Sequence, residues 1–533
     1  MDDVDDETSP DIDDCAREPI HVIGNIQSHG LLLALSEPDL IVRHVSANVE
    51  TLLDISAESL LDQSLEVAVG PSQFETFRAY ISSGGLNTAN PLRMHVGTRA
   101  LTVDCLAHRQ DGALIIEFEV PHGARSLGPV NITEHVRLPF SRMEREADIA
   151  QLSATAASEI QRLSGFARVI VYRFDEGWDG DVLAEAASMP TRSYLGLRFP
   201  AGDIPAQVRK LFLINPVRAI ADAGSMPVPI IPNVIPSTEK PLDLTHSCLR
   251  SPSPLHAEYM RNMGVQSSIT VSIIVRNRLW GLILCHHPAP RRTDWALRLV
   301  CRHVGEMLGS RIATVNERNA LHERLAFRTL LDKCMPTMAA ARPAVDAATQ
   351  GARYLELLNS DGVISCIGGV VSFYGATVAE ALLRPVIGEL RELAVLGVAS
   401  SRVLSELHVT AERYTANASG ALYIGLDEQC GDYVLLLRRE HVETITWAGD
   451  REKDVSAAAQ GKLRPRTSFA PWRETVRGHS RPWTENDLDN ARLLRERLLR
   501  MPASETSRRT QPSVRVFRSP RPNHQRHPVP RST

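Results

Sequence analysis

Arginine, histidine, tyrosine and aspartate side chains gather in one stretch of the sequence, between residues 172 and 287. Residues 199–205 within it read FPAGDIP, a rigid turn that leads into a helix. Pro205 suits the first helical turn because its missing N–H costs nothing there. Arg218 and Arg250 carry planar, forked donors that match carboxylates. These residue types predict a concave, polar pocket in the middle of the chain.

Each of these residues also has a plainer interpretation. Asp203 suits the start of a helix, and a single arginine is more often a surface residue. His256, behind a proline turn, and His286, at the end of a strand, are each more often structural than functional when taken alone. No Cys/His spacing suits zinc, and the sequence has no nucleotide-binding loop, nucleophile elbow or kinase signature. The residues alone therefore indicate a sensory or binding protein and leave its ligand open.

The eight cysteines are widely spread, and none forms a CxxC pair. Metal and redox motifs are therefore not indicated, and the pattern is typical of single buried thiols in a reducing compartment. Cys15 differs because it lies in a polar segment before the first apolar run. On position alone, the simplest interpretation of Cys15 is a free thiol on a flexible arm.

Length and composition predict a multidomain, water-soluble chain. Its 533 residues, 43% of them apolar, suit three to four domains with buried cores. The net charge of -4 gives no general attraction to nucleic acid or to a membrane surface. No apolar run is long enough for a membrane helix, and the acidic start lacks the basic region of a signal peptide. A cytoplasmic protein is expected.

Two sheet-containing regions are expected to position the polar residues. Apolar runs that alternate, or that are bounded by turn residues, predict strands. In the first region the expected strands are 31–35, 40–42, 100–107 and 113–120. In the second, the expected elements are a helix at 144–163, a strand at 167–175 and a hairpin of strands 268–275 and 279–287. Residues 121–139 between them carry glycine and proline and are predicted to be a linker.

A long helix is predicted from about residue 295 to 327. Its apolar stripe consists of Val304, Leu308, Ile312, Val315, Leu321 and Leu325. A helix of about 30 residues spans ~45 Å, so it either connects two domains or closes one core. A third mixed region follows at 328–503, with a strand at 432–437 and a helix at 487–501. Between residues 447 and 483 the pattern is irregular, which is typical of a functional or disordered stretch.

Both ends of the chain are predicted to be disordered. Residues 1–14 hold eight acids and no base. Residues 504–533 hold seven arginines, one acid and many prolines and serines, and cannot bury a core. Such a basic tail can touch nucleic acid or anionic lipid. A solvated tail, or one produced by a frameshift, is the preferred interpretation.

Several short motifs occur in an order and at a spacing that resemble the bacteriophytochromes, over about residues 12–503. The motifs are CAREPIH at 15–21, GNIQSHG at 24–30, PAGDIP at 200–205, RNMGVQSS at 261–268, LWGLILCHH at 279–287, PRTSF at 465–469 and WRE at 472–474. No single motif suffices, but the ordered set is specific.

The resemblance implies an α+β fold with three sheet-containing domains, joined by a knot and by the long helix. These are a PAS domain at 15–120, a bilin-binding GAF domain at 121–310 and a PHY domain at 311–503, whose tongue covers about 447–478. The knot arises where the N-terminal segment threads through a GAF loop. The cofactor implied is biliverdin IXα, joined by a thioether to Cys15, because the GAF position that plant-type members use is Leu255 here.

The resemblance also implies partners and a mechanism. A homodimer through GAF and PHY helices is expected, with a histidine kinase, response regulator or transcriptional partner downstream, and neither membrane nor nucleic acid as a partner. Light would drive Z/E isomerisation at ring D and rearrange the tongue, giving a red/far-red photoreceptor. No kinase domain is found, so the chain is not expected to be an enzyme. The alternatives are a pigment-free GAF-type sensor and a truncated light-regulated histidine kinase.

Single residues take roles from the resemblance. Asp203 and His256 are expected beside the pyrrole nitrogens, and Arg218 and Arg250 on the propionates. The other expected bilin contacts are Ser268 and Thr270 through hydroxyls, Tyr172, Phe199, Tyr259 and His286 around ring D, and Ile204 and Pro205 beside Asp203. From the tongue, Arg466 is expected to reach Asp203, and Ser468 is a second expected contact. The departures from the family pattern are Ile23 and Ser28 in place of proline and Phe212 in place of tyrosine.

Overall fold

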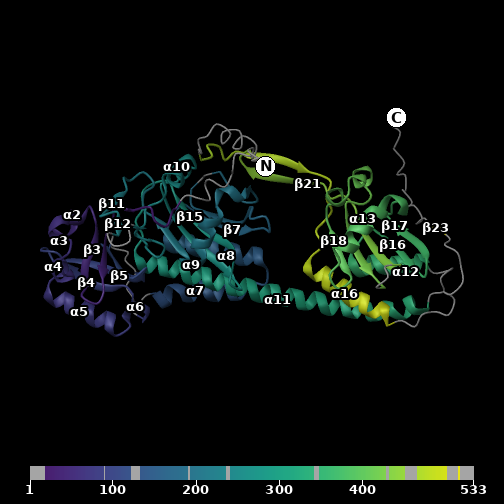
Figure 1. Ribbon diagram of the computed structural model, residues 1–533, viewed down its shortest axis with the longest axis horizontal. Coiled ribbons are helices and arrows are strands. Elements are labelled where there is room, and N and C mark those ends of the chain that lie inside the picture. Colours follow the sequence, from purple (N-terminus) through teal and green to yellow (C-terminus); the bar gives the residue numbers. More distant parts are fainter. Residues whose placement is uncertain are drawn as a thin grey trace, which may run out of the picture. The chain divides into compact units, whose positions relative to one another are not determined.

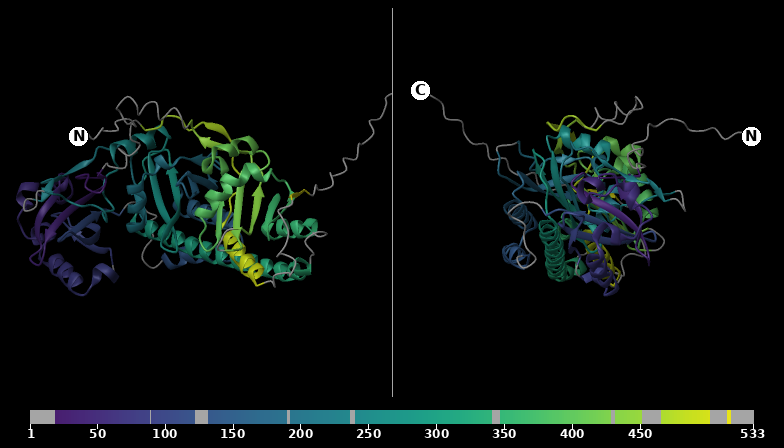
Figure 2. Two further views of the ribbon diagram at one scale, coloured as in Figure 1. Left: turned by 45° about the vertical axis from the view of Figure 1, so that its right-hand side comes forward. Right: turned by 90° about the vertical axis from the view of Figure 1, so that its left-hand side faces the viewer.

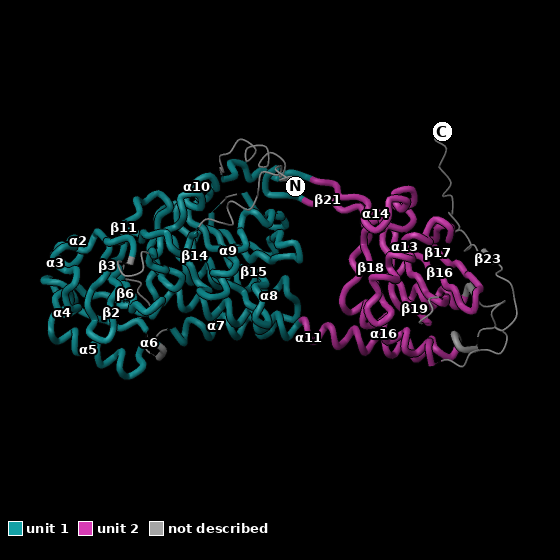
Figure 3. The backbone as a smooth tube through the Cα atoms, in the orientation of Figure 1, with its two compact units in different colours: residues 1–315, 446–473 teal, residues 316–445, 474–533 magenta. Residues whose placement is uncertain are grey.

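The computed structural model describes residues 19–88, 90–121, 132–189, 192–235, 240–340, 347–427, 431–450, 465–500 and 514–516. The chain divides into two compact units (Figure 3). Residues 1–315 and 446–473 form unit 1, and residues 316–445 and 474–533 form unit 2. Each unit combines sheets with helices, so the predicted α+β class is confirmed.

The first sheet of unit 1 has seven strands, in the order β1-β11-β3-β2-β6-β5-β4. Figure 1 labels β3, β4, β5 and β11 of this sheet. Their bounds are β1 Asn25–Ile26, β2 Gly30–Ser36, β3 Ile41–Ser46, β4 Leu92–Val96, β5 Leu101–Gln110, β6 Ala113–Glu119 and β11 Val228–Ile231. The helices beside it are α2 Val49–Leu53, α3 Ala57–Leu60, α4 Leu65–Val69, α5 Pro71–Ser82 and α6 Gly85–Thr88. In β6, alternate residues Leu114, Ile116 and Phe118 join the core that these helices cover. The strands expected at 31–35, 100–107 and 113–120 are therefore present.

The N-terminal strand β1 runs against the loop of residues 217–251. Its pairing with β11 joins this loop to the first sheet. The backbone N–H of Gln27 donates to Leu249 O at 2.7 Å, and the Gln27 side-chain amide donates to Ala219 O at 3.0 Å. The loop therefore contacts the N-terminal segment at its beginning and at its end, which is the contact that the expected knot requires.

The second sheet of unit 1 has eight strands, in the order β10-β14-β15-β7-β8-β9-β21-β22. Their bounds are β7 Arg168–Phe174, β8 Gly180–Ala187, β9 Arg198–Phe199, β10 Val217–Ile220, β14 Ser267–Val275, β15 Arg278–His287, β21 Glu443–Ala448 and β22 Pro471–Val476. Figures 1 and 2 show helices α8 (Ile149–Ser164) and α11 (Trp295–Ala340) along one face. That face forms a core with Val171, Ile269, Val271, Ile283 and Cys285. A short two-stranded sheet of β12 (Val234–Ile235) and β13 (Lys240–Pro241) completes the sheets described in this unit.

Three expectations for unit 1 are wrong in detail. Residues 132–144 form helix α7 (Ile132–Glu144), with Pro139 inside it, and not a linker. The helix expected at 144–163 begins only at Ile149, where Asp148 accepts from Ala150 N and caps it. Pro205 is the N-cap of α9 (Ala206–Ile214), one residue before the first turn, and its extended ψ of 158° explains why the helix starts after it.

The long helix α11 is longer than expected, and its apolar stripe is not continuous. It runs to Ala340 and includes Pro336. The predicted stripe members Leu321 and Leu325 are exposed. Before them the helix packs into the core of unit 1, and after them Phe327, Leu331 and Cys334 pack into a core of unit 2. The stripe breaks because the two halves bury different faces in two different cores.

Unit 2 holds a six-stranded sheet, in the order β18-β19-β20-β16-β17-β23. Its strands are β16 Gly362–Ile367, β17 Val370–Gly375, β18 Val398–Ser401, β19 Gly420–Gly425, β20 Tyr433–Arg438 and β23 Val514–Val516. The helices around it are α12 Ala347–Leu358, α13 Glu380–Glu392, α14 Leu404–Leu407 and α16 Glu485–Leu499, with the 3-10 helix η3 Val409–Tyr414. Residues 514–516 pair with β17, so this part of the tail is not disordered as expected. The acidic arm, the rest of the tail and residues 451–464 lie outside the described residues.

The stretch expected to be irregular, 447–483, contains two strand segments. The end of β21 and all of β22 belong to the eight-stranded sheet, and Trp447 on β21 pairs with Arg198 on β9. None of the helices among the described residues is both long and apolar enough to cross a membrane.

Candidate functional site

The eight-stranded sheet presents five of the predicted polar residues on one face. Its register sets Arg218 opposite Thr270 and Ser268 opposite His286. Directly paired residues project to the same side of a sheet, and residues two apart along a strand share that side. Tyr172 on β7 projects there too, through its pairing with β15. Because α8 and α11 cover the other face, this face is the one left for a site.

Asp203 accepts hydrogen bonds from two of the predicted site residues, Tyr259 and Arg466, and only the Arg466 contact was predicted. It ends the short 3-10 helix η2 (Ala201–Asp203), and its side chain is only 12% exposed. The Tyr259 hydroxyl donates to Oδ2 at 3.0 Å, and Arg466 Nη2 donates to Oδ1 at 3.1 Å. Two donors on a nearly buried carboxylate, one of them charged, stabilise its ionised form.

Arg466 is itself held from several sides. Its Nη1 donates to Ala448 O, and its own carbonyl accepts from Asn262 Nδ2 at 3.1 Å. The neighbouring Phe469 lies edge-on to Tyr259, with ring centroids 5.3 Å apart. Burial and the charge of Asp203 raise the pKa of Tyr259 well above its usual value, so its hydroxyl remains a donor. Arg466 and Phe469 thus contact Asp203 and Tyr259 in one connected network.

Tyr172 is buried among aromatic rings. It is 2% exposed and lies edge-on to Phe199, with centroids 6.0 Å apart. Its hydroxyl has no hydrogen-bond partner among the described residues. Burial, followed by the charge of Asp203, raises its pKa well above the usual value. A Cβ on Gly180 would come within 1.6 Å of the Tyr172 ring, so the ring occupies space that only glycine leaves open.

Arg218 and Arg250 are a pair of cations that donate to backbone carbonyls. Arg218 donates to the carbonyls of Cys248 (3.3 Å) and Arg250, and Arg250 donates to Ile20 O at 3.1 Å. Neither arginine has a carboxylate partner among the described residues. Burial first, and then the charge of Arg250, lower the pKa of Arg218 to about 9. Two guanidinium groups in this state are a donor set for carboxylates.

The two predicted histidines are neutral. The His256 side chain has exposed surface, yet the protein around it lowers its pKa to about 4, with Arg218 adding to the effect. Its ring lies parallel to that of Tyr259, with centroids 6.3 Å apart. Burial, Arg168 and His256 lower the pKa of His286 to about 3. The Nδ1 atom of His286 has no partner within the described part of the chain, so it is available to a ligand.

Models of three protein families match the chain. The PAS fold matches residues 15–121, the GAF domain residues 148–312 and the phytochrome region residues 328–507. A bacteriophytochrome of Xanthomonas campestris pv. campestris is 34% identical over 502 residues, which cover 92% of this chain and 78% of that protein. The chain belongs to the phytochrome family.

Further relatives support the same conclusion for this phytochrome. Cyanobacterial phytochrome B of Nostoc sp. is 32% identical over 514 residues, covering 96% of the chain and 68% of that protein. The crystal structure of a bacteriophytochrome from R. palustris has a TM-score of 0.83 and 33% identity, and covers 91% of this chain and 98% of that one. The photosensory core module of the Stigmatella aurantiaca phytochrome has a TM-score of 0.80, also at 33% identity, and covers 91% and 97%. The family recognised from the sequence motifs is therefore confirmed.

Not every predicted residue of this phytochrome joins the network. Ser468 is exposed, and among the described residues its hydroxyl accepts only from Ala470 N, at 3.5 Å. Ile204 packs into the aromatic cluster of Phe199, and Pro205 caps α9 beside it. Cys15 lies outside the described residues.

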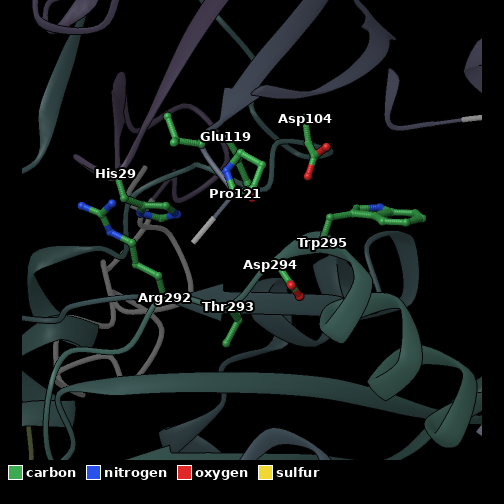
Figure 4. A pocket seen from close by; sticks show the side chains of 9 residues that line it. His29, Asp104, Glu119, Pro121, Arg292, Thr293, Asp294 and Trp295 are labelled. Carbon is green, nitrogen blue, oxygen red and sulfur yellow. The ribbon is translucent and has the colours of Figure 1, made fainter. Parts of the chain in front are cut away.

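The sequence analysis assigned no role to Asn262 or Gly180. Asn262 stands in the RNMG motif, whose position was noted without a function, and Gly180 carries no local signal. Figure 4 shows a small pocket in this phytochrome that lies elsewhere. It is lined by His29, Asp104, Glu119, Val120, Pro121, Arg292, Thr293, Asp294 and Trp295, and none of these is a predicted site residue.

Proposed function

We propose that this chain is a red/far-red light receptor that carries biliverdin IXα. The observation that carries the proposal is the pair Arg218 and Arg250, two enclosed guanidinium groups whose partners are backbone carbonyls. Two cations of this kind match a ligand with two carboxylates, and the bilin has two propionates. The unpartnered hydroxyl of Tyr172 and Nδ1 of His286 on the same sheet face fit a ligand with further polar groups.

Each predicted site residue then has a role in binding the bilin. Arg218 and Arg250 bind the propionates and fix the position of the ligand. His256 and Asp203 offer one neutral and one anionic group for the pyrrole nitrogens. Ser268 and Thr270 add hydroxyls, while His286 and the aromatic residues Tyr172, Phe199 and Tyr259 enclose the far end. A bound bilin supplies a conjugated system that absorbs visible light and isomerises between Z and E forms.

Cys15 is the proposed point of covalent attachment. Arg250 Nη1 contacts Ile20 O at 3.1 Å, so the segment that follows Cys15 lies at the arginine pair. Ile20 follows Cys15 by five positions, and five residues of chain span at most about 17 Å. The PAS-fold match also begins at residue 15.

The tongue is the proposed output element of the site. Arg466 and Tyr259 both donate to Asp203, so a change of hydrogen bonding at Asp203 alters the support of the tongue. We further propose that the protein signals as a homodimer through GAF and PHY helices, to a histidine kinase, response regulator or transcriptional partner, and that it works in the cytoplasm. The name phytochrome and the photosensory core module of the Stigmatella protein support a sensory role.

The test is to express the chain with biliverdin and to record absorption spectra before and after red and far-red light. A visible band that changes reversibly is expected. A protein without a visible band would be a pigment-free sensor, and the proposal would be wrong. Pigment should stay with the wild-type chain through denaturation but not with Cys15→Ser. Cys248→Ser is the matched control and should retain it, because Cys248 lies beside the arginine pair but is not the proposed anchor.

A further inference from the structure

Glu117 is a buried acid at the centre of the first sheet. It is 1% exposed and lies on β6, where Leu32 and Leu106 pair with it on either side. Its side of β6 also carries Ile115, which packs with Leu249 in an apolar cluster. A carboxyl group in such surroundings is costly unless hydrogen bonds satisfy it.

The hydrogen bonds of Glu117 come from a segment more than 130 residues away in sequence. Its Oε2 accepts from Cys248 N at 2.9 Å, and its Oε1 accepts from Leu249 N at 2.6 Å. The side chain of Leu249 is fixed from the other direction by Gly30, since a Cβ there would come within 2.5 Å of it. Residues 248 and 249 are therefore held by the first sheet through both backbone and side chain.

This anchored segment leads directly into the arginine pair. Arg250 follows Leu249, and its carbonyl accepts from Arg218 Nη2 and from Gln27 Nε2. Arg218 Nη1 donates to the carbonyl of Cys248 at 3.3 Å. The position of both guanidinium groups thus depends on the backbone that Glu117 holds.

We infer that Glu117 is a positioning residue for the carboxylate-binding arginines, through which the PAS domain helps to build the bilin site of the GAF domain. The inference rests on the proposed function for the identity of the ligand. The hold on residues 248 and 249 does not depend on that function. The simplest alternative is that Glu117 acts only as a negative charge near the two arginines.

The substitution Glu117→Gln distinguishes a positioning role from a purely electrostatic role, because the two predict opposite changes in biliverdin affinity. Glu117→Gln keeps the size of the side chain but turns a donor toward one of the two N–H groups. Above about pH 7 Glu117 is ionised, because burial raises its pKa only to about 7. There, on charge alone, removing this anion from beside two arginines would tighten the binding of a dianion. Loss of positioning would weaken it. We therefore expect biliverdin to bind about tenfold more weakly to Glu117→Gln, the size of effect that follows from one lost bond to a buried acid.

The experiment uses Cys15→Ser chains, so that biliverdin binding is reversible and a dissociation constant can be measured by absorbance. Biliverdin dimethyl ester, which lacks free propionates, is the second probe, and its affinity should not change with Glu117→Gln. Amide hydrogen exchange of the pigment-free protein gives an independent reading. At least one of the amides of Cys248 and Leu249 should exchange about tenfold faster.

Asp104→Asn is the matched control. Asp104 is also a buried acid of this sheet, on the adjacent strand β5, but its partner is Arg93 within the same sheet. It should change neither the exchange of residues 248 and 249 nor biliverdin affinity. If Glu117→Gln does not fold, Glu117→Asp takes its place. This variant keeps the charge and withdraws the oxygens, so positioning predicts weaker binding and charge alone predicts no change.

Each result has a definite meaning. Unchanged exchange, or unchanged or tighter biliverdin binding, would overturn the inference. So would an equal loss of affinity for the dimethyl ester, because the effect would then not pass through the propionate-binding arginines. If the parent chain binds no biliverdin, the proposed function fails and the ligand part of the inference with it. The exchange rates then still decide whether Glu117 holds the segment.

Discussion

At the scale of single residues, the space around Tyr172 is set by a residue with no side chain. The Tyr172 ring lies where a Cβ of Gly180 would be, 1.6 Å from Cζ and 1.9 Å from the hydroxyl oxygen. Phe174 and Phe199 surround the ring edge-on, so it has few other positions within the cluster. Gly180 therefore selects the inward position of the Tyr172 hydroxyl, close to the negative charge of Asp203.

Gly180→Ala should displace the Tyr172 ring and lower the stability of unit 1. Forcing extra atoms into a packed core costs about 1–3 kcal/mol. Urea unfolding measures this loss, and the loss should vanish when Tyr172→Ala is already present, because the obstructing ring is then gone. Gly202→Ala is the control, since a Cβ there meets nothing within 4 Å. An equal loss in the presence and absence of the Tyr172 ring would contradict the steric argument.

The residues that the sequence could not reveal share one physical cause. Glu117 and Glu119 alternate with Ile116 and Phe118, a pattern that indicates a solvent-facing side of a strand. Both glutamates are buried, because residues 248–249 bind Glu117 and Arg298 of α11 pairs with Glu119 at 2.7 Å. Coverage by segments distant in the sequence leaves no local signal. Asp203 and Arg466 were placed together only through resemblance to a family.

At the scale of elements, local patterns predict those elements whose cause is local. The hairpin of β14 and β15 was expected because Arg276 and Asn277 form its turn, and both have the positive φ of a tight hairpin. The strands β21 and β22 were missed because their pairing depends on β9 in a distant part of the chain. α11 was judged too short because its apolar face changes where it passes from one core to another.

The contact between Arg466 and Asp203 gives a prediction for the stability of strand β22. Arg466→Ala removes a charged donor to Asp203 and the donor to Ala448 O, and keeps the backbone carbonyl that accepts from Asn262. Losing a hydrogen bond to a buried charged group costs about 1.5–3 kcal/mol, so β22 should open more often. Amide hydrogen exchange of residues 472–476 in the pigment-free protein should become at least about tenfold faster.

A matched variant shows whether this effect belongs to Arg466 alone. Arg473→Ala removes an exposed arginine from β22 itself and should leave exchange nearly unchanged. Equal exchange in the wild type and Arg466→Ala would mean that strand pairing alone holds the tongue. With biliverdin bound, a changed rate of photoproduct reversion in Arg466→Ala would further link this contact to the proposed switch.

At the scale of the whole molecule, groups with shifted pKa values concentrate in unit 1. Burial lowers the pKa of His29 and His108 to about 4 and that of His286 to about 3. Between about pH 4 and 6.5 these histidines are charged in the unfolded chain and neutral in the folded one. Burial also raises the pKa of Glu117 to about 7, against the opposing effect of its two backbone hydrogen bonds. From about pH 4.5 to 7 this acid binds its proton more tightly in the folded state.

The two effects have opposite signs, and the histidines outnumber the acid. Stability rises with pH wherever the unfolded state binds more protons, so the histidines make acidification destabilising and Glu117 partly offsets them. The free energy of unfolding of unit 1 should therefore fall as the pH decreases from 6.5 to 4. In hydrogen exchange corrected for the intrinsic pH dependence, β5 and β14 should lose protection before β19 and β20 of unit 2.

His108→Gln should reduce the slope of the unfolding free energy against pH by at most about 1.4 kcal/mol per pH unit, since it removes one titrating group. His303→Gln, at an exposed position of α11, should not. If protection is lost in both units at the same pH, or if it is lost first in unit 2, the buried histidines are not what limits the acid stability of the protein.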